Sequence, residues 1–393
     1  LWSVGGSWNI YKEKFFQADF VDMLKLRASY GIGGNIGRNT APYLIASYYD
    51  SSLVDGMAGS VNTPPNKDIR WEKTTTVNVG VDFALFRHRL SGTIEYYNKY
   101  SVDLLAAING SPTQGFGYTT LMTNNGKMVN RGVEITLSGE IIRQKDFSWN
   151  ASLLYAFNRN KVKHISVQPS LWDSRISMPT SYPMVGKPLY GIYAYKWAGL
   201  NENGDPQVYD AENNVTSGPA RDYHALVYCG TTVPIHNASL TNVLRYKGFE
   251  FSAMLILDAG HKLRSSNIPS INMSNGRITS TAKGIVDRWT QPGDVTDVPR
   301  LLFSNDTENF NTHRTELYRY SDLFVYDASN IRLSNISLAY RVPAHWCKKI
   351  SLSGARLQFN VENVATFAFD SKANYDLGGK VKPNYVWGLY LNF

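Results

Sequence analysis

Apolar and polar residues alternate along much of this chain, which is the pattern of a β-strand with two different faces. From Thr74 to Phe86, every second position is apolar and the positions between them are mostly polar or small. After a short turn at Arg87 and His88, the alternation resumes from Leu90 to Tyr97. A period of two places the two sets of side chains on opposite faces, so these segments predict an antiparallel hairpin.

Nine further segments show the same alternation, which makes eleven predicted strands in all. At roughly 12 residues each, they exceed the ~5–6 of soluble sheets and match tilted strands that cross a bilayer. The nine are Trp2–Ile10, Met23–Tyr30, Asn130–Ile142, Phe147–Asn158, Asn237–Tyr246, Phe249–Ala259, Ser329–Tyr340, Leu352–Glu362 and Tyr385–Phe393.

The connections alternate between short and long, as the periplasmic turns and extracellular loops of a membrane barrel do. The short ones are expected near Arg87 and at Arg143–Asp146, Lys247–Gly248 and Arg341–Lys349. The long ones are expected at Gly31–Lys73, Ser101–Val129, Arg159–His236, Gly260–Asn330 and Asn363–Asn384. A further segment, Tyr190–Leu200 with its return Pro206–Tyr209, is interpreted as a hairpin inside a long loop. The last strand then ends in the periplasm.

An odd number of antiparallel strands leaves the first and last strands parallel, so eleven strands do not close a barrel by antiparallel pairing alone. The chain is therefore expected to form part of a larger barrel, and eleven is half of the 22 strands of the large plugged transporters. The alternative is a closed barrel of twelve strands, which requires one more strand than the alternation pattern identifies.

The two faces differ as lipid and lumen faces differ. On the strand Phe147–Asn158, residues 147, 149, 151, 153, 155 and 157 are all apolar or aromatic, whereas Ser148, Asn150, Ser152 and Asn158 face the other way. Aromatic residues near both strand ends suit the two interfacial girdles. The lumen is expected to hold Lys25, Arg27, Glu95, Glu134 and Glu250. The competing interpretation is a soluble β-sandwich with a solvated outer face.

Composition narrows the function classes. Aromatic residues make up 13% of the chain and charged residues only 18%, which excludes a disordered tail and a coiled coil. No run approaches the ~18 apolar residues of a membrane-spanning helix. The net charge is +8, but the basic residues lie singly or in short groups at segment ends, so nucleic-acid binding is not expected. The two cysteines build neither a disulfide framework nor a zinc site.

No motif for catalysis, metal or cofactor stands out. The glycines from Gly31 to Gly34 follow a strand but lack the third glycine of a dinucleotide loop, so a flexible exit into a loop is the simpler interpretation. The seven histidines are scattered. The segment Asn201–Asp205 offers oxygens to calcium but departs from EF-hand spacing, and a glycine-containing turn explains it better. We expect no enzyme, no metal and no cofactor.

The long loops are rich in aromatic and amide side chains, which stack on sugar rings or peptide side chains and donate hydrogen bonds. The candidate substrate-binding residues are Trp172, Tyr182, Tyr193, Tyr195 and Trp197, accompanied by Tyr190, Asn124, Asn125, Asn201 and Asn203. Packing of these loops on themselves is an equally good interpretation of the same residues.

The C-terminal segment alternates up to a final aromatic residue and resembles the assembly signal that the barrel-insertion machinery reads. Its residues are Tyr385, Trp387, Leu389, Leu391 and Phe393. Further short segments, in family order over nearly the whole chain, are similar to stretches of the SusC/RagA-like TonB-dependent transporters of Bacteroidota. They include 24–31, 69–74, 78–83, 126–134, 158–162, 197–200, 246–250, 288–294 and 328–338. Near the end, Asp376-Leu377-Gly378-Gly379 departs from the usual family pattern, which has a different acidic-Pro loop at this place.

This resemblance implies a 22-stranded outer-membrane barrel with a plug, a TonB box that contacts the TonB complex, and a SusD-like surface lipoprotein as a lid. Residues 1–393 resemble the C-terminal barrel part alone, and the start at Leu1 leads us to expect a missing N-terminal portion with the plug and the TonB box. The expected function is import of an oligosaccharide or oligopeptide. The alternatives are a soluble or surface β-rich glycan-binding protein and a passive porin.

Overall fold

The computed structural model is dominated by one large antiparallel sheet. It describes residues 1–37, 42–52, 56–109, 113, 120–167, 174–218, 222–273, 282–303, 312–349, 351–377 and 382–393. Among these residues, no helix is long and apolar enough to cross a membrane.

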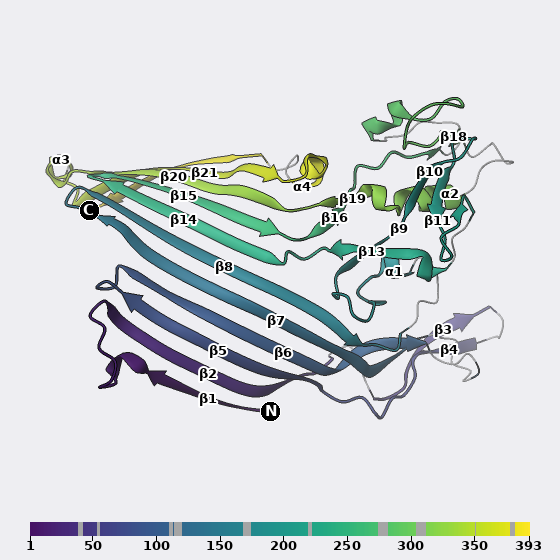
Figure 1. Ribbon diagram of the computed structural model, residues 1–393, viewed down its shortest axis with the longest axis horizontal. Helices are drawn as coiled ribbons and strands as arrows, with labels where there is room; N and C mark the ends of the chain where they lie inside the picture. The colour runs from purple at the N-terminus through teal and green to yellow at the C-terminus, as the bar shows by residue number, and fades with distance from the viewer. Residues whose placement is uncertain are drawn as a thin grey trace.

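The main sheet contains eleven strands within the described residues, and their spatial order follows their order along the chain (Figure 1). All eleven predicted strands are confirmed, and β15 has the predicted bounds. The strands are β1 (Trp2–Asn9), β2 (Val21–Asn35), β5 (Glu72–Leu85), β6 (Leu90–Asn109), β7 (Thr120–Arg143), β8 (Phe147–His164), β14 (His236–Tyr246), β15 (Phe249–Ala259), β20 (Asn330–Val342), β21 (Gly354–Ala368) and β22 (Asn384–Asn392).

The sheet is curved and open, with β1 and β22 as its two edge strands (Figure 1). In the ladder, β1 pairs with β2 and β22 pairs with β21, both antiparallel. The edges of a sheet carry unpaired backbone groups, and a lipid environment tolerates none of them. An eleven-stranded open sheet therefore agrees with the expectation that this chain forms part of a larger barrel.

The short turns all lie at one end of the sheet, together with the C-terminus, and the long connections lie at the other end (Figure 1). The turn between β5 and β6 is so tight that Phe86, Arg87 and His88 all have φ near +60°. The connection from β20 to β21 holds a short helix, α3 (Ala344–Lys348). The predicted asymmetry of the connections is confirmed.

Three strands extend farther toward the long-loop end than the pattern predicts. The ladder of β6 and β7 continues to the pair Asn109 and Thr120, where a loop from Ser101 to Val129 was expected. Strand β2 continues to Asn35, so Gly31 lies within the ladder, directly opposite Ser3, and is not a loop exit. Strands β3 (Ile45–Ser51) and β4 (Gly56–Thr63) form a separate hairpin in the next connection.

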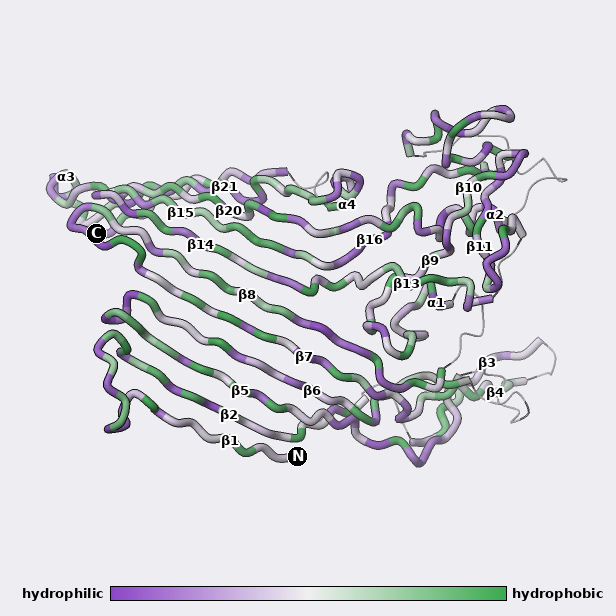
Figure 2. The backbone as a smooth tube through the Cα atoms, in the orientation of Figure 1, coloured by the Kyte–Doolittle hydropathy of each residue, from purple (hydrophilic) through white to green (hydrophobic). Residues whose placement is uncertain are grey.

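The two faces of the sheet have opposite character, and hydropathy alternates along the strands in Figure 2. One row across neighbouring strands joins Leu26, Val81, Ile94, Ile135 and Tyr155, all apolar or aromatic. The adjacent row on the other face joins Arg27, Gly80, Glu95, Glu134 and Ala156. In a membrane barrel the first face contacts lipid and the second lines the lumen.

The long connections fold together at the end of the sheet, and we call residues 174–218, 222–231, 261–273, 282–303 and 312–327 the mouth cluster (Figure 1). Its strands are β9 (Gly191–Tyr195), β10 (Trp197–Leu200), β11 (Pro206–Tyr209), β12 (Val215–Thr216), β13 (Leu226–Thr231), β16 (Lys262–Arg264), β17 (Asn272–Met273), β18 (Leu302–Phe303) and β19 (Val325–Asp327). Its helices are α1 (Ser174–Ser177) and α2 (Thr312–Arg319), with the 3-10 turns η3 (Tyr223–Ala225), η4 (Lys283–Asp287) and η5 (Asp322–Phe324). Outside the mouth cluster lie η1 (Ile10–Lys12), η6 (Ser371–Ala373) and α4 (Asn374–Leu377).

The predicted hairpin inside the long loop is also confirmed. Strands β10 and β11 pair with each other in a small sheet separate from the main one. The preceding strand, β9, pairs instead with β13. The span Tyr190–Leu200 therefore belongs to the mouth cluster and leaves the parity of the membrane strands unchanged.

Candidate functional site

The mouth cluster has a hydrophobic core of its own. The buried residues Tyr193, Tyr195, Val208, Ala225, Leu226 and Leu317 pack together, drawn from β9, β11, η3, β13 and α2. Loops with a packed core hold a defined shape, since opening them exposes apolar surface to water. The long-loop end of the sheet is therefore a folded structure that can present a surface of fixed geometry.

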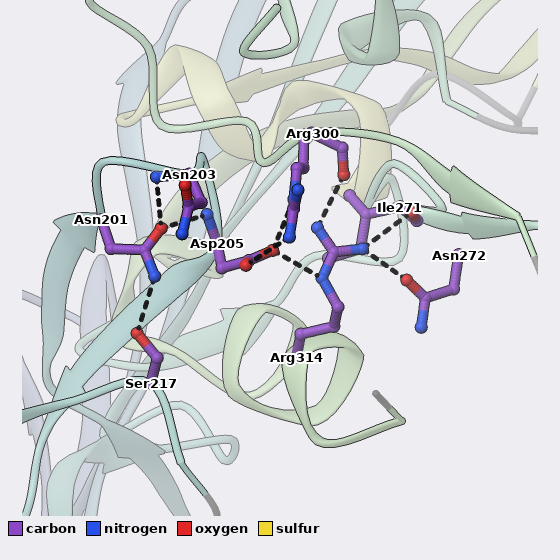
Figure 3. Close-up of polar contacts among 8 residues, drawn as sticks. All are labelled: Asn201, Asn203, Asp205, Ser217, Ile271, Asn272, Arg300 and Arg314. Carbon is purple, nitrogen blue, oxygen red and sulfur yellow. Dashed lines mark hydrogen bonds and ion pairs between the residues drawn. The ribbon is translucent and has the colours of Figure 1, made fainter. Parts of the chain in front are cut away.

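One carboxylate joins three distant loops of this cluster (Figure 3). Asp205, at the end of the β10–β11 turn, accepts hydrogen bonds from Arg300 Nε at 3.0 Å and Nη2 at 2.8 Å. Arg314 of α2 donates from Nε to the same carboxylate at 3.0 Å. Paired donation from a guanidinium group to a carboxylate fixes orientation as well as distance.

Arg314 also holds the backbone around it. Its Nη1 donates to the carbonyl of Ile271 at 3.1 Å, and its Nη2 donates to the carbonyl of Arg300 at 2.7 Å. Burial lowers the pKa of Arg314, and the charge of Asp205 acts in the opposite direction. Arginine remains charged despite this lowered pKa, so the nearly complete burial of Arg314 depends on these hydrogen-bond acceptors.

The turn that carries Asp205 is braced by an asparagine. Asn201 Oδ1 accepts from the backbone N–H groups of Asn203 at 3.0 Å and Asp205 at 2.9 Å (Figure 3). Gly204 has φ +74°, which only glycine adopts without strain. The turn interpretation of this segment is confirmed, and two arginines occupy the carboxylate that the calcium alternative requires.

A third arginine, Arg264 of β16, ties β9 to the end of α2. Its Nη2 donates to the carbonyl of Tyr193 at 2.7 Å, and its Nη1 donates to the carbonyls of Arg319 and Ser321, both at 3.1 Å. Burial lowers the pKa of Arg264 below its ordinary value. The cluster is thus held by arginine bonds to backbone as well as by its apolar core.

The last long connection is fastened to the same cluster. Asp376 in α4 accepts from Ser265 Oγ at 2.8 Å, from Ser266 N at 3.0 Å and from Ser266 Oγ at 2.6 Å. These bonds join the segment after β21 to the segment after β16. Asp376 lies in the stretch that departs from the family pattern, whereas Gly378 and Gly379 lie outside the described residues.

The predicted substrate-binding residues occupy different surroundings. Tyr193 and Tyr195 are 1% and 0% exposed, so their rings offer no face to a substrate and their role in this structure is packing. Tyr182 is half-buried, and its backbone carbonyl accepts a bond from Arg175 Nε at 3.4 Å. Trp197 is also half-buried, and Trp172 lies outside the described residues.

Among these aromatic residues, Trp197 combines a fixed orientation with partial exposure, as a substrate contact requires. Its indole Nε1 donates to Asp297 Oδ1 at 3.0 Å, and its backbone N–H donates to Asp322 Oδ1 at 2.9 Å. Its ring lies 5.9 Å from that of Tyr318. These contacts hold the indole at a fixed angle and leave part of it accessible.

Two of the predicted amide side chains, those of Asn124 and Asn201, form hydrogen bonds with backbone groups. Asn124 donates to the carbonyls of Arg70 and Asp103, both at 2.7 Å, and accepts from the backbone N–H of Arg70 at 2.8 Å. Asn201 braces its own turn, as described above. Asn203 is exposed.

Below the mouth, the polar face of the sheet carries ion pairs between strands that are adjacent or separated by one strand. Arg27 of β2 bridges Asp82 of β5 at 3.1 Å and Glu95 of β6 at 2.8 Å. Farther along, Glu250 accepts from Arg245 at 2.7 Å and from Arg356 at 3.0 Å. The three predicted lumen residues in these pairs, Arg27, Glu95 and Glu250, therefore lie on the hydrophilic face of the sheet.

Burial shifts two titratable groups of the mouth cluster toward their neutral forms. Burial raises the pKa of the Cys229 thiol to about 11 and lowers the pKa of His261. The described part of the chain has no group of three or more His, Cys, Asp or Glu side chains placed to hold a metal ion. The cluster is suited to binding through shape and hydrogen bonds.

The C-terminal residues form the edge strand β22. Tyr385, Trp387, Leu389 and Leu391 share one face and are exposed. On the neighbouring strand, Phe359 packs against Trp387 with ring centroids 4.2 Å apart. This face continues the apolar face of the sheet, as expected of a strand at the lipid boundary.

Three residues that organise the mouth, Asp205, Arg300 and Arg314, were not singled out from the sequence. Arg300 and Arg314 follow Asp205 by 95 and 109 positions, and none of the three belongs to a motif. The one available signal was the Asn201–Asp205 turn, which predicted the position of the carboxylate but not its partners.

Comparison with known proteins agrees with this architecture. Residues 1–364 match the family model described as TonB dependent receptor-like, beta-barrel. The chain is 26% identical over 411 residues to TonB-dependent receptor P3 of Formosa agariphila. The aligned region covers 98% of this chain and 39% of that protein. It is 26% identical over 383 residues to TonB-dependent receptor SusC of Bacteroides thetaiotaomicron, covering 92% of this chain and 36% of that protein.

Among solved structures, that of the RagAB peptide transporter superposes with a TM-score of 0.78 at 24% identity. The match covers 100% of this chain and 43% of the matched chain. This likeness supports the barrel fold. The chain spans about two-fifths of the length of the proteins it resembles, 39% in the case of receptor P3.

Proposed function

This chain belongs to the TonB dependent receptor-like β-barrel family, and we propose from this premise that it forms the C-terminal barrel part of an active outer-membrane importer. Members of this family and their SusC and RagA relatives are proteins of the outer membrane, so the resemblance and the location expected from the sequence are both confirmed. The proposed cargo is an oligosaccharide or an oligopeptide. The mechanism is gated binding without catalysis.

The observation that carries the proposal is the combination of a two-faced open sheet with a folded mouth. Ion pairs such as Arg27 with Glu95 line one face, and aliphatic residues cover the other. A barrel with a polar wall lets a hydrophilic solute cross the apolar layer of the membrane. The packed mouth cluster, held by Asp205, supplies a surface of fixed shape at the entrance.

The rest of the proposed importer lies on other chain segments and proteins. We propose that the plug and the TonB box belong to the part of the protein that this chain does not include, and that the TonB complex acts on them. A SusD-like surface lipoprotein is the proposed lid over the mouth cluster. The barrel-insertion machinery is the proposed partner of the segment that ends at Phe393.

At the mouth, Trp197 and Tyr182 are the proposed substrate contacts among the described residues. Both rings are partly accessible, and an indole or phenol face stacks on a sugar ring or on a peptide side chain. Trp172 remains a proposed contact from the sequence alone. Tyr193 and Tyr195 are proposed to act indirectly, because they hold β9 in the core beneath these residues.

Uptake by cells tests this proposal directly. Cells expressing the full-length protein with its lipoprotein receive labelled pools of oligosaccharides or oligopeptides, with and without a functional TonB. We expect saturable uptake from one pool, and its loss when TonB is deleted. Uptake that persists without TonB would favour a passive porin, and a soluble product that binds glycans would favour the alternative of a secreted binding protein.

Two tyrosine variants distinguish the loss of a substrate contact from a general loss of folding. Tyr182→Ala, at the mouth, is expected to weaken binding of the imported pool about fivefold, since one stacking contact contributes about 1 kcal/mol. Tyr246→Ala provides the control, because this exposed tyrosine lies at the turn end of the same sheet. Equal binding by both variants would remove Tyr182 from the proposed site.

A further inference from the structure

The apolar face of the sheet changes character abruptly near the mouth. On β8, the residues that face outward are aromatic at Tyr155 and Phe157, and then basic at Arg159 and Lys161. On β7, the same face is aliphatic at Val133 and then basic at Arg131. The change therefore occurs at one level on two neighbouring strands, at the end of the sheet where the long connections lie.

The basic residues of this patch lie beside one another. Arg131 and Arg159 are direct partners in the ladder between β7 and β8, and Lys161 is the partner of Val129, one step nearer the mouth. All three basic side chains are exposed. We call Arg131, Arg159 and Lys161 the outer basic patch.

Like charges that lie directly opposite each other in a ladder repel. Within the described residues, none of the three basic side chains forms an ion pair with a carboxylate. Arg131 has a neutral partner, since its Nε donates to Asn98 Oδ1 at 3.0 Å. That bond orients the guanidinium and leaves its Nη donors available, so the patch is an arrangement of fixed donors around an uncompensated positive charge.

Two arginines at the opposite end of these strands have acceptors close by. Arg89 donates to the carbonyls of Glu140 and Ile141 at 3.3 and 3.0 Å, and Arg143 lies 3.5 Å from the carboxylate of Glu140. Arg143 at the turn end thus has a carboxylate beside it, whereas neither arginine of the outer basic patch does in the part of the chain that the structure describes.

We propose that the outer basic patch binds the phosphate of a phosphorylated lipid in the outer leaflet of the membrane. The patch lies immediately beyond the aromatic residues Tyr155 and Phe157, and the ring centroid of His236 lies 6.1 and 5.3 Å from theirs. Interfacial aromatic side chains mark the level of the headgroups. Two arginines side by side match the geometry of phosphate oxygens, and a nearby lysine adds charge. This role is separate from the proposed import.

The chain contains a matched control at the same height. Lys99 of β6 is the ladder partner of Asn130, next to Arg131 along β7, so its side chain lies on the opposite, lumen face. There it lies over the ring of Tyr97, 5.1 Å from the centroid. Lys25 faces the same lumen, nearer the turn end. Changes at Lys25 and Lys99 remove as much charge as changes at Arg131 and Arg159 without touching the outward face.

The test uses the full-length protein, purified in detergent and titrated with lipid A that carries its phosphate and with lipid A from which phosphate has been removed. The variant Arg131→Gln/Arg159→Gln is expected to bind the phosphorylated lipid about 30-fold more weakly than the parent. Lys25→Gln/Lys99→Gln is expected to bind like the parent. Glutamine keeps the length and polarity of the side chains, and heat-modifiable migration verifies that each barrel is folded.

Three results would overturn the proposal. One is parental affinity in the Arg131→Gln/Arg159→Gln variant. Another is equal binding of lipid A with and without phosphate, which would assign the interaction to acyl chains. The third is full displacement by inorganic phosphate at equal concentration, which would make the patch a site for a free anion and not for a lipid.

Discussion

Asp205 and Arg314 lie 109 positions apart, yet Arg314 Nε donates to Asp205 Oδ1 at 3.0 Å. Only 4% of the arginine side chain is exposed. Because the carboxylate also accepts from Arg300, one negative charge holds two arginines that arrive from different loops. One residue in a tight turn therefore joins three loops of the mouth cluster, in addition to the apolar core.

Replacing Asp205 with asparagine is expected to loosen the mouth while leaving the sheet intact. The substitution removes the charge that compensates the buried Arg314, at a cost of about 2 to 3 kcal/mol in the local opening free energy. Hydrogen exchange should show faster exchange in β9, β11 and α2. The control is Glu202→Gln, which removes an exposed charge from the same turn. Unchanged protection in Asp205→Asn would show that the apolar core alone fixes the cluster.

Cys229 is expected to react slowly with alkylating reagents. Burial raises the pKa of its thiol from 9.0 to about 11, so the thiolate fraction at neutral pH is about 100-fold smaller than for an ordinary cysteine. The alkylation rate of a Cys347→Ser protein should continue to rise with pH up to about 11. In the Asp205→Asn background, we expect faster alkylation at pH 8. A rate that levels off near pH 9 in the parent would contradict the burial of this thiol.

The sequence predicts the sheet well because each strand separates two unlike environments. Alternation is therefore strong in the membrane part, and Phe249–Ala259 is found with the predicted bounds. Alternation is weakest where glycine interrupts a strand. Gly31, Gly33 and Gly34 suggest a loop by composition, but β2 continues through them because its neighbours β1 and β5 supply hydrogen bonds on both sides.

The mouth is only partly predictable, for a different reason. Alternation places Tyr193 and Tyr195 on one face of a strand, but it does not indicate whether that face meets a substrate or another loop. Leu317, which completes their core, comes from α2, more than a hundred residues later. A contact between such distant segments leaves no periodic signal, so the arginines around Asp205 also required the structure.

Gly132→Ala is expected to destabilise the barrel. A Cβ at Gly132 would overlap the ring of Tyr97 on the neighbouring strand and the backbone oxygen of Phe157. Relieving this overlap moves a buried ring or the ladder itself, at about 1 to 3 kcal/mol. The unfolding transition of the full-length protein, followed by heat-modifiable migration, should therefore shift to lower temperature. Gly33→Ala is the control, because its nearest neighbour, the Thr74 carbonyl oxygen, is 3.9 Å away. Equal shifts would point to general glycine effects.

Phe393→Ala is expected to slow assembly without weakening the assembled barrel. The side chain of Phe393 is 93% exposed, so its removal costs little packing among the described residues. The resemblance of the segment to an assembly signal predicts that the machinery for insertion reads the aromatic ring. Pulse labelling should show a several-fold slower appearance of the folded form, whereas urea unfolding of the purified protein should be unchanged. Phe369→Ala removes another exposed phenylalanine, 62% accessible, and should assemble at the parental rate. If Phe393→Ala also assembles at that rate, the segment is an ordinary edge strand and carries no signal at its last residue.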